Sequence, residues 1–338
     1  MLQIFLRQSL TLVLESVLLT LLRIHKNCGR YIMKFNVDDL VAKKLVTKKT
    51  YTEGPFAGLS VLKYKNNVFW DNLWHTDARL LECRGMVVDA DNNVVIWPFT
   101  KIFNRFENGT DLPLDQEVVC IRKLNGFMAT ATIRNGELLV STTGTLDSEF
   151  CGIARKHLEK FDFNKVSFAE DYTFIFEICD ESDPHVVEED HGAYLIGARD
   201  LALNGVMVEE SKLDRIAAFA GFLRPNWTVT TFGTVVEHVK SVNHEGFVIR
   251  NVGTDDENSE LLLKIKSPHY LAKKFLMRGS QNKWDMIWDN PKEAKKRIDE
   301  EFYELLDWLR WAYEKEEWAA KDSQYRRMII EKYFEDRK

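Results

Sequence analysis

The sequence has few of the features that mark a secreted, membrane-spanning or zinc-bound protein. Its five cysteines are odd in number, form no CxxC pair, and have no histidine at zinc-finger spacing. No run of 18 uncharged apolar residues occurs, because the best candidate, residues 4–24, contains Arg7, Glu15 and Arg23. We therefore expect no membrane partner and a reducing, cytoplasmic location.

Several common catalytic motifs are also missing. The chain has no GxxxxGK[ST], no GxGxxG and no HExxH, which argues against a P-loop protein, a dinucleotide fold and a zinc protease. The net charge is −6, from 46 Lys plus Arg and 52 Asp plus Glu, so a nucleic acid would have to bind in a local basic cleft. A length of 338 residues favours two domains.

The apolar stretch within residues 1–32 has three interpretations. It is a signal-like segment, although no small-residue cleavage site follows it, or an apolar helix that docks on the body of the protein. The interpretation we favour is an upstream extension, with Met33 as the native start, because MKFNVDDL resembles a natural soluble N-terminus. This segment carries no part of the functional argument.

Short strands dominate the chain from residue 51 to residue 145. Turn signals at Asn66–Asn67, at residues 91–93 and at Asn135–Gly136 predict antiparallel hairpins, the last most strongly. A helix is expected over residues 147–160, with Asp147 or Ser148 as its cap. Further strands are expected at residues 172–179, 193–201, 205–210, 245–252 and 260–267, and another helix at residues 211–222.

The pattern changes after residue 269. Residues 270–338 carry apolar side chains at helical spacing, and no five-stranded barrel pattern follows Ser267. We therefore divide the chain into an extension (1–32), a main domain (33–269) and a helical C-terminal domain (270–338). Tryptophans in the last are expected to pack in its core rather than to stack on bases: Trp284, Trp288, Trp308, Trp311 and Trp318.

Four short charged motifs stand at the ends of predicted strands. They are Lys123-Leu124-Asn125-Gly126, Phe176-Glu177, Glu245-Gly246 and Lys264-Ile265-Lys266. Each is weak alone, since a lysine at a strand end is usually a solvated charge. Their order over residues 51–267 resembles the motif series of the covalent nucleotidyltransferases, the superfamily of ATP-dependent ligases and mRNA-capping enzymes.

Two further segments refine the resemblance. Cys83-Arg84-Gly85, followed by PFTKIFN at residues 98–104, is similar to the segment upstream of the nucleophile in RNA ligases of the bacteriophage RNA ligase 1 type. The residues 141–145 (STTGT) resemble an element that follows the nucleophile motif. The implied fold is α+β: an ATP-grasp-like core of antiparallel sheets flanked by helices, plus a small helical C-terminal domain.

The resemblance implies a role for each site residue. Lys123 would be the nucleophile that forms a lysyl-AMP, and Glu245 would help to hold a divalent cation. ATP and Mg²⁺ (or Mn²⁺) would be the cofactors. The remaining residues would bind the nucleotide, with the first two of them on its β and γ phosphates: Arg84, Lys101, Asn125, Gly126, Glu177, Lys264 and Lys266.

The proposed chemistry requires lysine as a free amine, although an ordinary lysine has a pKa near 10.4. We expect Arg84, Lys264, Lys266 and a bound cation to favour the neutral amine of Lys123. We also expect glycine at positions 126 and 246 to let the nucleotide approach the backbone closely, although an ordinary turn would equally explain both glycines.

Asn125 departs from the commonest motif, which has aspartate at this position. An asparagine accepts a hydrogen bond only through its neutral carbonyl, so the pair with the lysine loses a charge. The change bears on the rate rather than on the type of reaction, and it leaves a non-catalytic relative as an alternative.

The expected function is ATP-dependent joining of RNA 5′-phosphate and 3′-hydroxyl ends, in RNA repair and tRNA repair in particular. The alternatives are a DNA ligase, a capping-type guanylyltransferase, and a non-catalytic RNA- or nucleotide-binding relative. Any kinase or phosphatase that heals the ends would be a separate partner protein. Four cations that flank the motifs are candidates for an RNA groove: Arg122, Lys273, Lys274 and Arg278.

Overall fold

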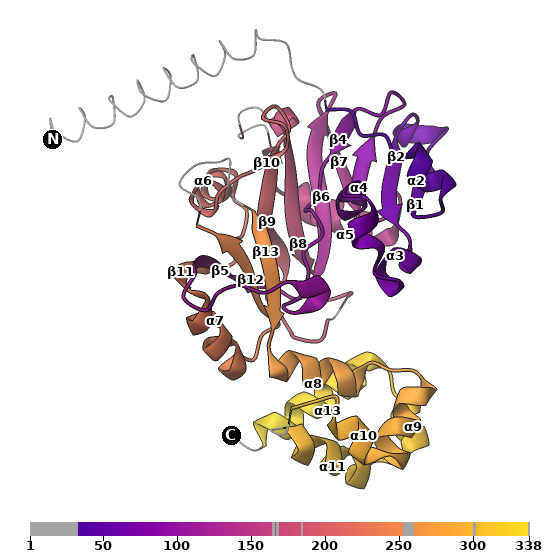
Figure 1. Ribbon diagram of the computed structural model, residues 1–338, viewed down its shortest axis with the longest axis vertical. Helices are drawn as coiled ribbons and strands as arrows, with labels where there is room; N and C mark the ends of the chain where they lie inside the picture. Colours follow the sequence, from indigo (N-terminus) through magenta and orange to yellow (C-terminus); the bar gives the residue numbers. More distant parts are fainter. Residues whose placement is uncertain are drawn as a thin grey trace, which may run out of the picture.

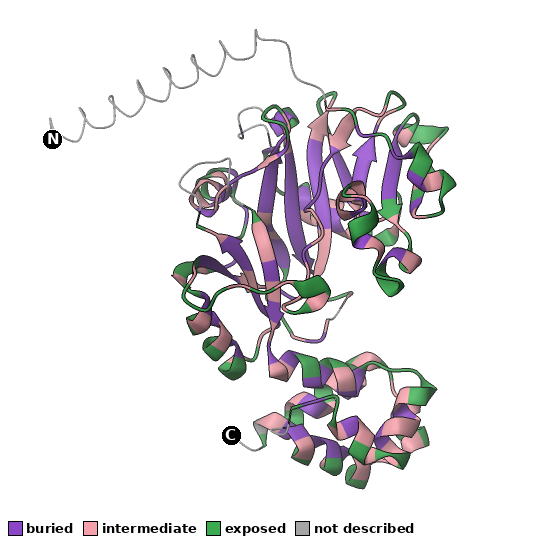
Figure 2. Cartoon of the chain, viewed as in Figure 1, coloured by how far each residue is buried: buried purple, intermediate pink, exposed green. Residues whose placement is uncertain are grey.

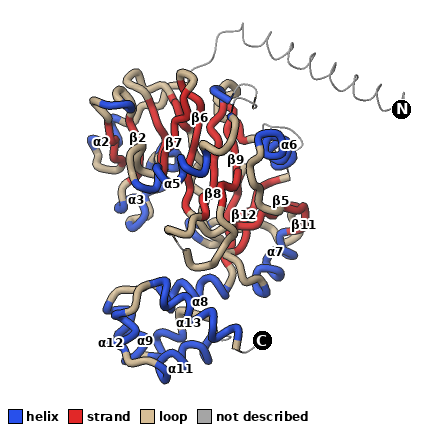
Figure 3. Tube along the Cα trace, turned by 180° about the vertical axis from the view of Figure 1, so that it is seen from behind, coloured by secondary structure: helices blue, strands red, loops and turns tan. Residues whose placement is uncertain are grey.

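A computed structural model describes residues 33–163, 166, 169–183, 185–252, 260–299 and 302–336. The interpretations of residues 1–32 lie outside these residues. The described chain has a large part that contains the sheets and a smaller part made only of helices, which lies beyond one end of the strands (Figure 1, Figure 3). We call them the sheet region and the helical region.

Three antiparallel sheets form the sheet region. The first has the order β1-β2-β3-β4, the second β10-β9-β8-β6-β7, and the third β11-β5-β12-β13. The first sheet comprises β1 (Val46–Thr50), β2 (Ser60–Tyr64), β3 (Arg84–Val88) and β4 (Val94–Ile96). The second comprises β6 (Phe127–Arg134), β7 (Glu137–Thr142), β8 (Tyr172–Cys179), β9 (Gly192–Asp200) and β10 (Val206–Met207). The third comprises β5 (Glu117–Lys123), β11 (Trp227–Thr231), β12 (Gly246–Asn251) and β13 (Leu261–Lys266).

Helices cover the second and third sheets. On the second, α5 (Glu149–Leu158) and α6 (Glu210–Ala220) enclose a core rich in phenylalanine and alanine. On the third, α7 (Phe232–His238) packs its apolar face against β5, β12 and β13. The short helices α2 (Asp38–Ala42), α3 (Asn66–Trp70) and α4 (Arg79–Glu82) add Leu40, Val68 and Leu80 to the core of the first sheet. Many of the buried residues lie in the strands (Figure 2).

Of three local predictions from the sequence, two are confirmed and one is wrong. Asn135 and Gly136 both have positive φ, as a two-residue hairpin between β6 and β7 requires, so that prediction is confirmed. The Ser148 hydroxyl accepts a hydrogen bond from the Cys151 N–H and caps α5, as predicted. The turn predicted at Asn66–Asn67 is wrong, because α3 begins there and three short helical segments separate β2 from β3.

The helical region follows β13 after a single residue. Its helices are α8 (Pro268–Met277), α9 (Gln281–Asp289), α10 (Pro291–Lys295), α11 (Tyr303–Ala312), α12 (Lys315–Ala320) and α13 (Ser323–Glu335). Trp284 and Trp318 are buried in its core, and Trp288 and Trp308 pack against that core. Trp311 is 83% exposed, so the prediction that it packs in the core is wrong.

Candidate active site

Three strand ends of the third sheet bring the predicted site together. Gly246 opens β12 and pairs with Lys123, the last residue of β5, and with Lys266, the last residue of β13. Glu245, one residue before Gly246, therefore lies between the two lysines. Its Oε2 is 3.0 Å from Nζ of Lys123, and its Oε1 is 3.1 Å from Nζ of Lys266.

The second sheet supplies the other carboxylate. Glu177 lies on β8, paired with Met128 of β6, and its Oε1 accepts a hydrogen bond of 3.0 Å from the Gly126 N–H. Both Glu177 and Glu245 are buried. Their charges act on the same ammonium group, that of Lys123.

The two motif glycines have a reason in the packing of the strands. A Cβ on Gly126 would lie 2.1 Å from the carbonyl oxygen of Ile178, and a Cβ on Gly246 would lie 2.1 Å from that of Ile265. Gly246 also has a φ of +133°. Strand contact therefore requires both glycines, which is a different reason from the nucleotide approach expected from the sequence.

The upstream segment lies beside the third sheet. The Lys264 N–H donates to the carbonyl oxygen of Phe103, and the Arg105 N–H donates to that of Lys264, each at 2.9 Å. This pairing brings Lys101 close enough to act on the charge of Lys264. Lys101 is also held by Glu107 at 3.2 Å, a residue that no sequence motif indicated.

Arg84 completes a cationic wall with Lys101 and Lys264. It opens β3, and no hydrogen bond or ion pair of its side chain is found in the described part of the chain. A Cβ on the next residue, Gly85, would lie 2.9 Å from Cα of Thr143. The two segments that refined the resemblance are therefore direct neighbours.

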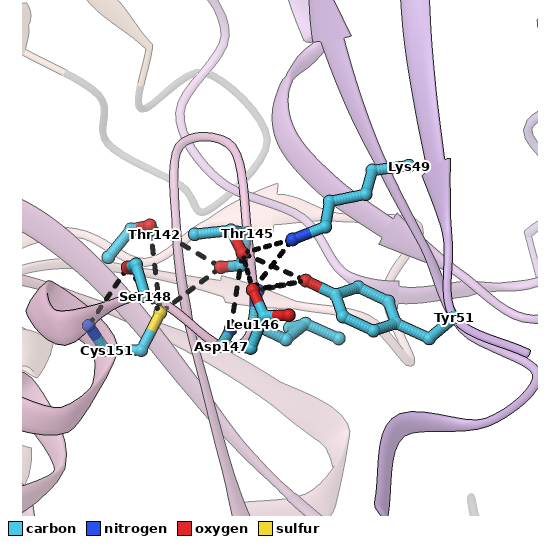
Figure 4. Close-up of polar contacts among 8 residues, drawn as sticks. All are labelled: Lys49, Tyr51, Thr142, Thr145, Leu146, Asp147, Ser148 and Cys151. Carbon is cyan, nitrogen blue, oxygen red and sulfur yellow. Dashed lines mark hydrogen bonds and ion pairs between the residues drawn. The ribbon is translucent and has the colours of Figure 1, made fainter. Parts of the chain in front are cut away.

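The STTGT element itself joins the first and second sheets. Ser141 is buried and shares a hydrogen bond of 2.6 Å with Thr130 on β6. Beyond it, Lys49 and Tyr51 reach across from the first sheet to Thr145 and Asp147 (Figure 4). The element acts here as a structural tie, since these groups satisfy one another.

A cavity of about 210 Å³ opens beside these groups. Its charged side consists of Arg84, Arg122, Lys123, Glu177 and Lys264. Its apolar side consists of Phe99, Ile102, Ile121, Met128, Ile196, Val248 and Leu261. Such a division suits a ligand with a flat apolar part and an anionic part. Cavities of about 350 Å³ lie elsewhere, but they contain none of the predicted site residues.

The charges of the site oppose one expectation. Burial lowers the pKa of Lys123, but the carboxylates of Glu177 and Glu245 outweigh it, and the net shift is upward. Without ligands, the cations expected to favour the neutral amine of Lys123 are therefore outweighed, and the part expected of a bound cation stays a prediction. The pKa of Lys264 falls instead, to about 7, mainly because the side chain is buried and also because Arg84 and Lys101 lie nearby.

The carboxylates shift in opposite directions. Burial raises the pKa of Glu177. Burial also acts on Glu245, but Lys123 and Lys266 outweigh it and lower its pKa. The lysines beside Glu245 therefore favour its ionised form, whereas burial disfavours the ionised form of Glu177.

The RNA-groove candidates divide into two groups. Lys273 is buried and its Nζ lies 2.8 Å from Oε1 of Glu331, so its prediction as a groove residue is wrong. Arg122 is paired with Glu189 at 2.6 Å. Lys274 and Arg278 are exposed on and just after α8, which starts beside the site.

Within the described residues, no group of three or more His, Cys, Asp or Glu side chains could hold a metal by itself. Two buried carboxylates, Glu177 and Glu245, are present instead. This donor set fits Mg²⁺ or Mn²⁺ shared with phosphates, since Mg²⁺ usually binds one or two carboxylates together with substrate oxygens. In the same part of the chain, no helix has the length and apolar character to cross a membrane.

The sequence model of a family described as RNA ligase matches residues 82–270, more than half of the chain and all the predicted site residues. No curated protein gives a significant match to the sequence.

The solved structures that share the fold include three ligases. Two are archaeal ATP-dependent RNA ligases. Form 2 is 15% identical with a TM-score of 0.53, over 87% of this chain and 74% of that one. Form 1 is 14% identical with a TM-score of 0.53, over 89% and 79%. The third is a candidate ATP-dependent DNA ligase from Aquifex aeolicus, 17% identical with a TM-score of 0.51, over 82% and 71%. The predicted α+β class with a helical C-terminal region is confirmed.

Proposed function

This chain belongs to the RNA ligase family, and we propose that it joins RNA 5′-phosphate and 3′-hydroxyl ends with ATP through a lysyl-AMP on Lys123. One observation supports this most. The ammonium of Lys123 lies 3.0 Å from Glu245, at the wall of a cavity with an apolar side and the cations Arg84 and Lys264. These are the groups that an adenosine, its phosphates and an attacking amine would require.

ATP would bind with its base on the apolar side of the cavity. Its phosphates would face Arg84 and Lys264, and Lys101 would join them if Glu107 released it. The pKa of Lys264 near 7 would rise on binding, because the phosphate charge favours the ammonium form. These cations would also stabilise the negative charge that gathers on the pyrophosphate as it leaves.

Lys123 would lose its proton before it attacks. In the free protein, the negative charges of Glu177 and Glu245 favour the protonated form of Lys123. We propose that Glu245 holds the divalent cation and that Glu177 contacts the nucleotide. A bound Mg²⁺ or Mn²⁺ would supply positive charge that offsets these carboxylates and favours the neutral amine. Lys266 keeps Glu245 ionised and in place.

The reaction would then have three steps. Nζ of Lys123 bonds to the α-phosphorus of ATP as the bond to the β-phosphate oxygen breaks, and pyrophosphate leaves. An oxygen of the RNA 5′-phosphate next takes the AMP, which breaks the phosphorus–nitrogen bond and regenerates Lys123. Finally, the RNA 3′-hydroxyl loses its proton and bonds to the 5′-phosphorus, and AMP leaves.

Repair of broken RNA is the proposed biological role, with a nicked tRNA as the first substrate to test. The support for this role is the family to which the chain belongs, rather than a particular group in the site. Lys274 and Arg278 are the exposed cations that we propose for RNA contact, and separate kinase and phosphatase proteins would prepare the ends. In the described residues no strand follows β13, so the barrel of DNA ligases and capping enzymes has no counterpart there.

The experiment is incubation with α-labelled ATP and Mg²⁺ or Mn²⁺, followed by denaturing electrophoresis. We expect covalent label on the wild type and none on Lys123→Ala. Lys296→Ala, which removes an exposed lysine of the helical region, is the matched control and should label normally. Labelled GTP is tested in parallel.

The other outcomes identify the alternatives. Label from GTP alone would indicate a capping-type guanylyltransferase. Label from neither nucleotide would indicate a binding protein. If ATP labels the chain, nicked RNA and nicked DNA with 5′-phosphates are compared, and sealing of DNA alone would indicate a DNA ligase.

A further inference from the structure

Asn125, the residue that departs from the commonest motif, bridges two segments inside the protein. Its side chain is only 5% exposed. Its Nδ2 donates a hydrogen bond of 2.8 Å to Oε2 of Glu245, the same oxygen that faces Lys123. Its Oδ1 accepts a hydrogen bond of 2.8 Å from the Val187 N–H.

Only a group that both donates and accepts can make these two contacts. An aspartate would still accept from Val187, but it has no hydrogen to give to Glu245 when ionised. It would instead place a second negative charge against Glu245. Repulsion between the two carboxylates would displace Glu245 from its position beside Lys123. The amide is therefore matched to the position of Glu245 in this chain.

The partner of Asn125 is held by the helical region. Val186 is fully buried in the core of that region, beside residues of α8 and α13. Nη1 of Arg327, on α13, donates a hydrogen bond of 3.2 Å to the carbonyl oxygen of His185. The peptide that contacts Asn125 is thus fixed by contacts on both of its preceding residues.

A second contact comes from α8 itself. The hydroxyl of Tyr270 interacts with both Asn125 and Glu245, and burial raises its pKa. Nζ of Lys266 lies 4.8 Å from the centre of the Tyr270 ring. The helical region therefore reaches Glu245 by two routes, through Asn125 and through Tyr270.

We propose that Asn125 is a positioning residue that holds Glu245 beside Lys123, and that the helical region holds Asn125 through residues 185–187. The proposal rests on the proposed function, since its effect is on the rate at which Lys123 takes AMP. It assigns the helices a part in nucleotide transfer in addition to any contact with RNA.

The first test is Asn125→Asp, with Asn66→Asp as the control because Asn66 is exposed on the short helix α3. The single-turnover rate of covalent labelling is measured over a range of ATP concentrations at one pH. For Asn125→Asp we expect a maximal rate roughly 10- to 100-fold lower, with the half-saturating ATP concentration within about twofold of the wild-type value. Asn66→Asp should keep both wild-type values.

A wild-type maximal rate for Asn125→Asp, or a loss that higher ATP concentrations restore, would overturn the proposal. If this variant does not fold, Asn125→Ala replaces it. We expect the maximal rate of labelling to fall for that variant as well, and unchanged labelling would overturn the positioning role.

The second test separates the helical contact from general stability. Val186→Ala and Leu309→Ala both leave cavities in the core of the helical region, but Leu309 is far in sequence from the 185–187 segment and lies on α11. We expect Val186→Ala to slow labelling of the folded protein at least 5-fold more than Leu309→Ala does. Equal rates would overturn the helical part of the proposal.

Labelling of the wild type by ATP distinguishes failure of the proposed function from failure of the positioning role. If the wild-type protein takes no label from ATP, the proposed function fails before any variant is compared. If it does take label, the variants test the positioning role alone.

Discussion

The sheet region and the helical region bury different kinds of side chain. In the described part of the helical region, the buried core is apolar and aromatic, with Lys273 and Arg326 as its buried charges. The sheet region buries several more charged groups, including Glu177, Glu210 and Glu245. Since burial of a charge is costly unless it is paired, the pairing in the sheet region shows which charges serve the fold and which serve the site.

Two charged networks of the sheet region illustrate this difference. Glu210 lies 2.7 Å from Arg250 and also pairs with Arg224, while Arg250 donates to the Val208 carbonyl oxygen at 2.7 Å. That network is closed. Around Lys123 and Glu245, cations outnumber the carboxylates, and Arg84 faces an open cavity. An excess of cations around a cavity is the condition in which an anionic ligand stabilises the protein when it binds.

The largest loss of stability should come from the apolar core of the helical region. Trp318 is fully buried, so Trp318→Ala should lower the free energy of unfolding by about 3–5 kcal/mol. Urea unfolding followed by tryptophan fluorescence and circular dichroism measures this. A loss below about 1 kcal/mol would show that this core is loosely packed and would remove the contrast between the regions.

Glu210→Ala tests the closed network of the sheet region. It removes the carboxylate that pairs with Arg250, which is 1% exposed, while Arg224 keeps Asp214 at 2.8 Å, so a loss of about 3–5 kcal/mol is expected. The rate of labelling by ATP in the folded protein should not change. A slower rate at full folding would mean that this network also supports the site.

Lys264→Met should separate function from stability. Labelling by ATP should fall roughly 100-fold, as expected when one charge that stabilises the leaving phosphate is removed. The free energy of unfolding should increase at pH 7. Lys264 has a pKa of about 7 in the folded protein and 10.5 when unfolded, so the folded state disfavours its charged form.

The sign of this effect depends on pH. Between pH 7 and pH 10.5 the unfolded chain binds the proton and the folded protein does not, so this lysine makes wild-type stability rise with pH. The variant should be more stable than the wild type at pH 7, and the difference should vanish above about pH 10.5. Unfolding by urea at several pH values measures it, and a variant less stable at pH 7 would contradict the assignment.

Trp311→Ala should have the smallest effect. Because Trp311 is 83% exposed, its removal should change the free energy of unfolding by less than about 0.5 kcal/mol. Comparison with Trp318→Ala in the same urea assay separates the effect of burial on stability from the effect of removing a tryptophan. A loss of 2 kcal/mol or more would show that Trp311 contacts another part of the protein in solution.

Local signals predicted much of the fold, and long-range contacts account for the failures. Asn135–Gly136 made a hairpin because both residues tolerate positive φ, whatever surrounds them. Asn66–Asn67 did not, because the chain there continues into α3, whose Val68 joins the core of the first sheet. Trp311 likewise shares a pattern with its buried neighbours, and only the packing of α11 decides which face is covered.

The sequence by itself determined the antiparallel sheets, the helical end and the set of residues at the site, because alternation, helical spacing and ordered motifs are written in the chain. Only the tertiary structure decided how those residues act on one another. Strand register placed Glu245 between Lys123 and Lys266, and Glu177 and Glu245 together outweigh burial and raise the pKa of Lys123. The same is true of Asn125, whose partners are 62 and 120 residues away, because hydrogen bonds depend on distances in space that no local pattern specifies.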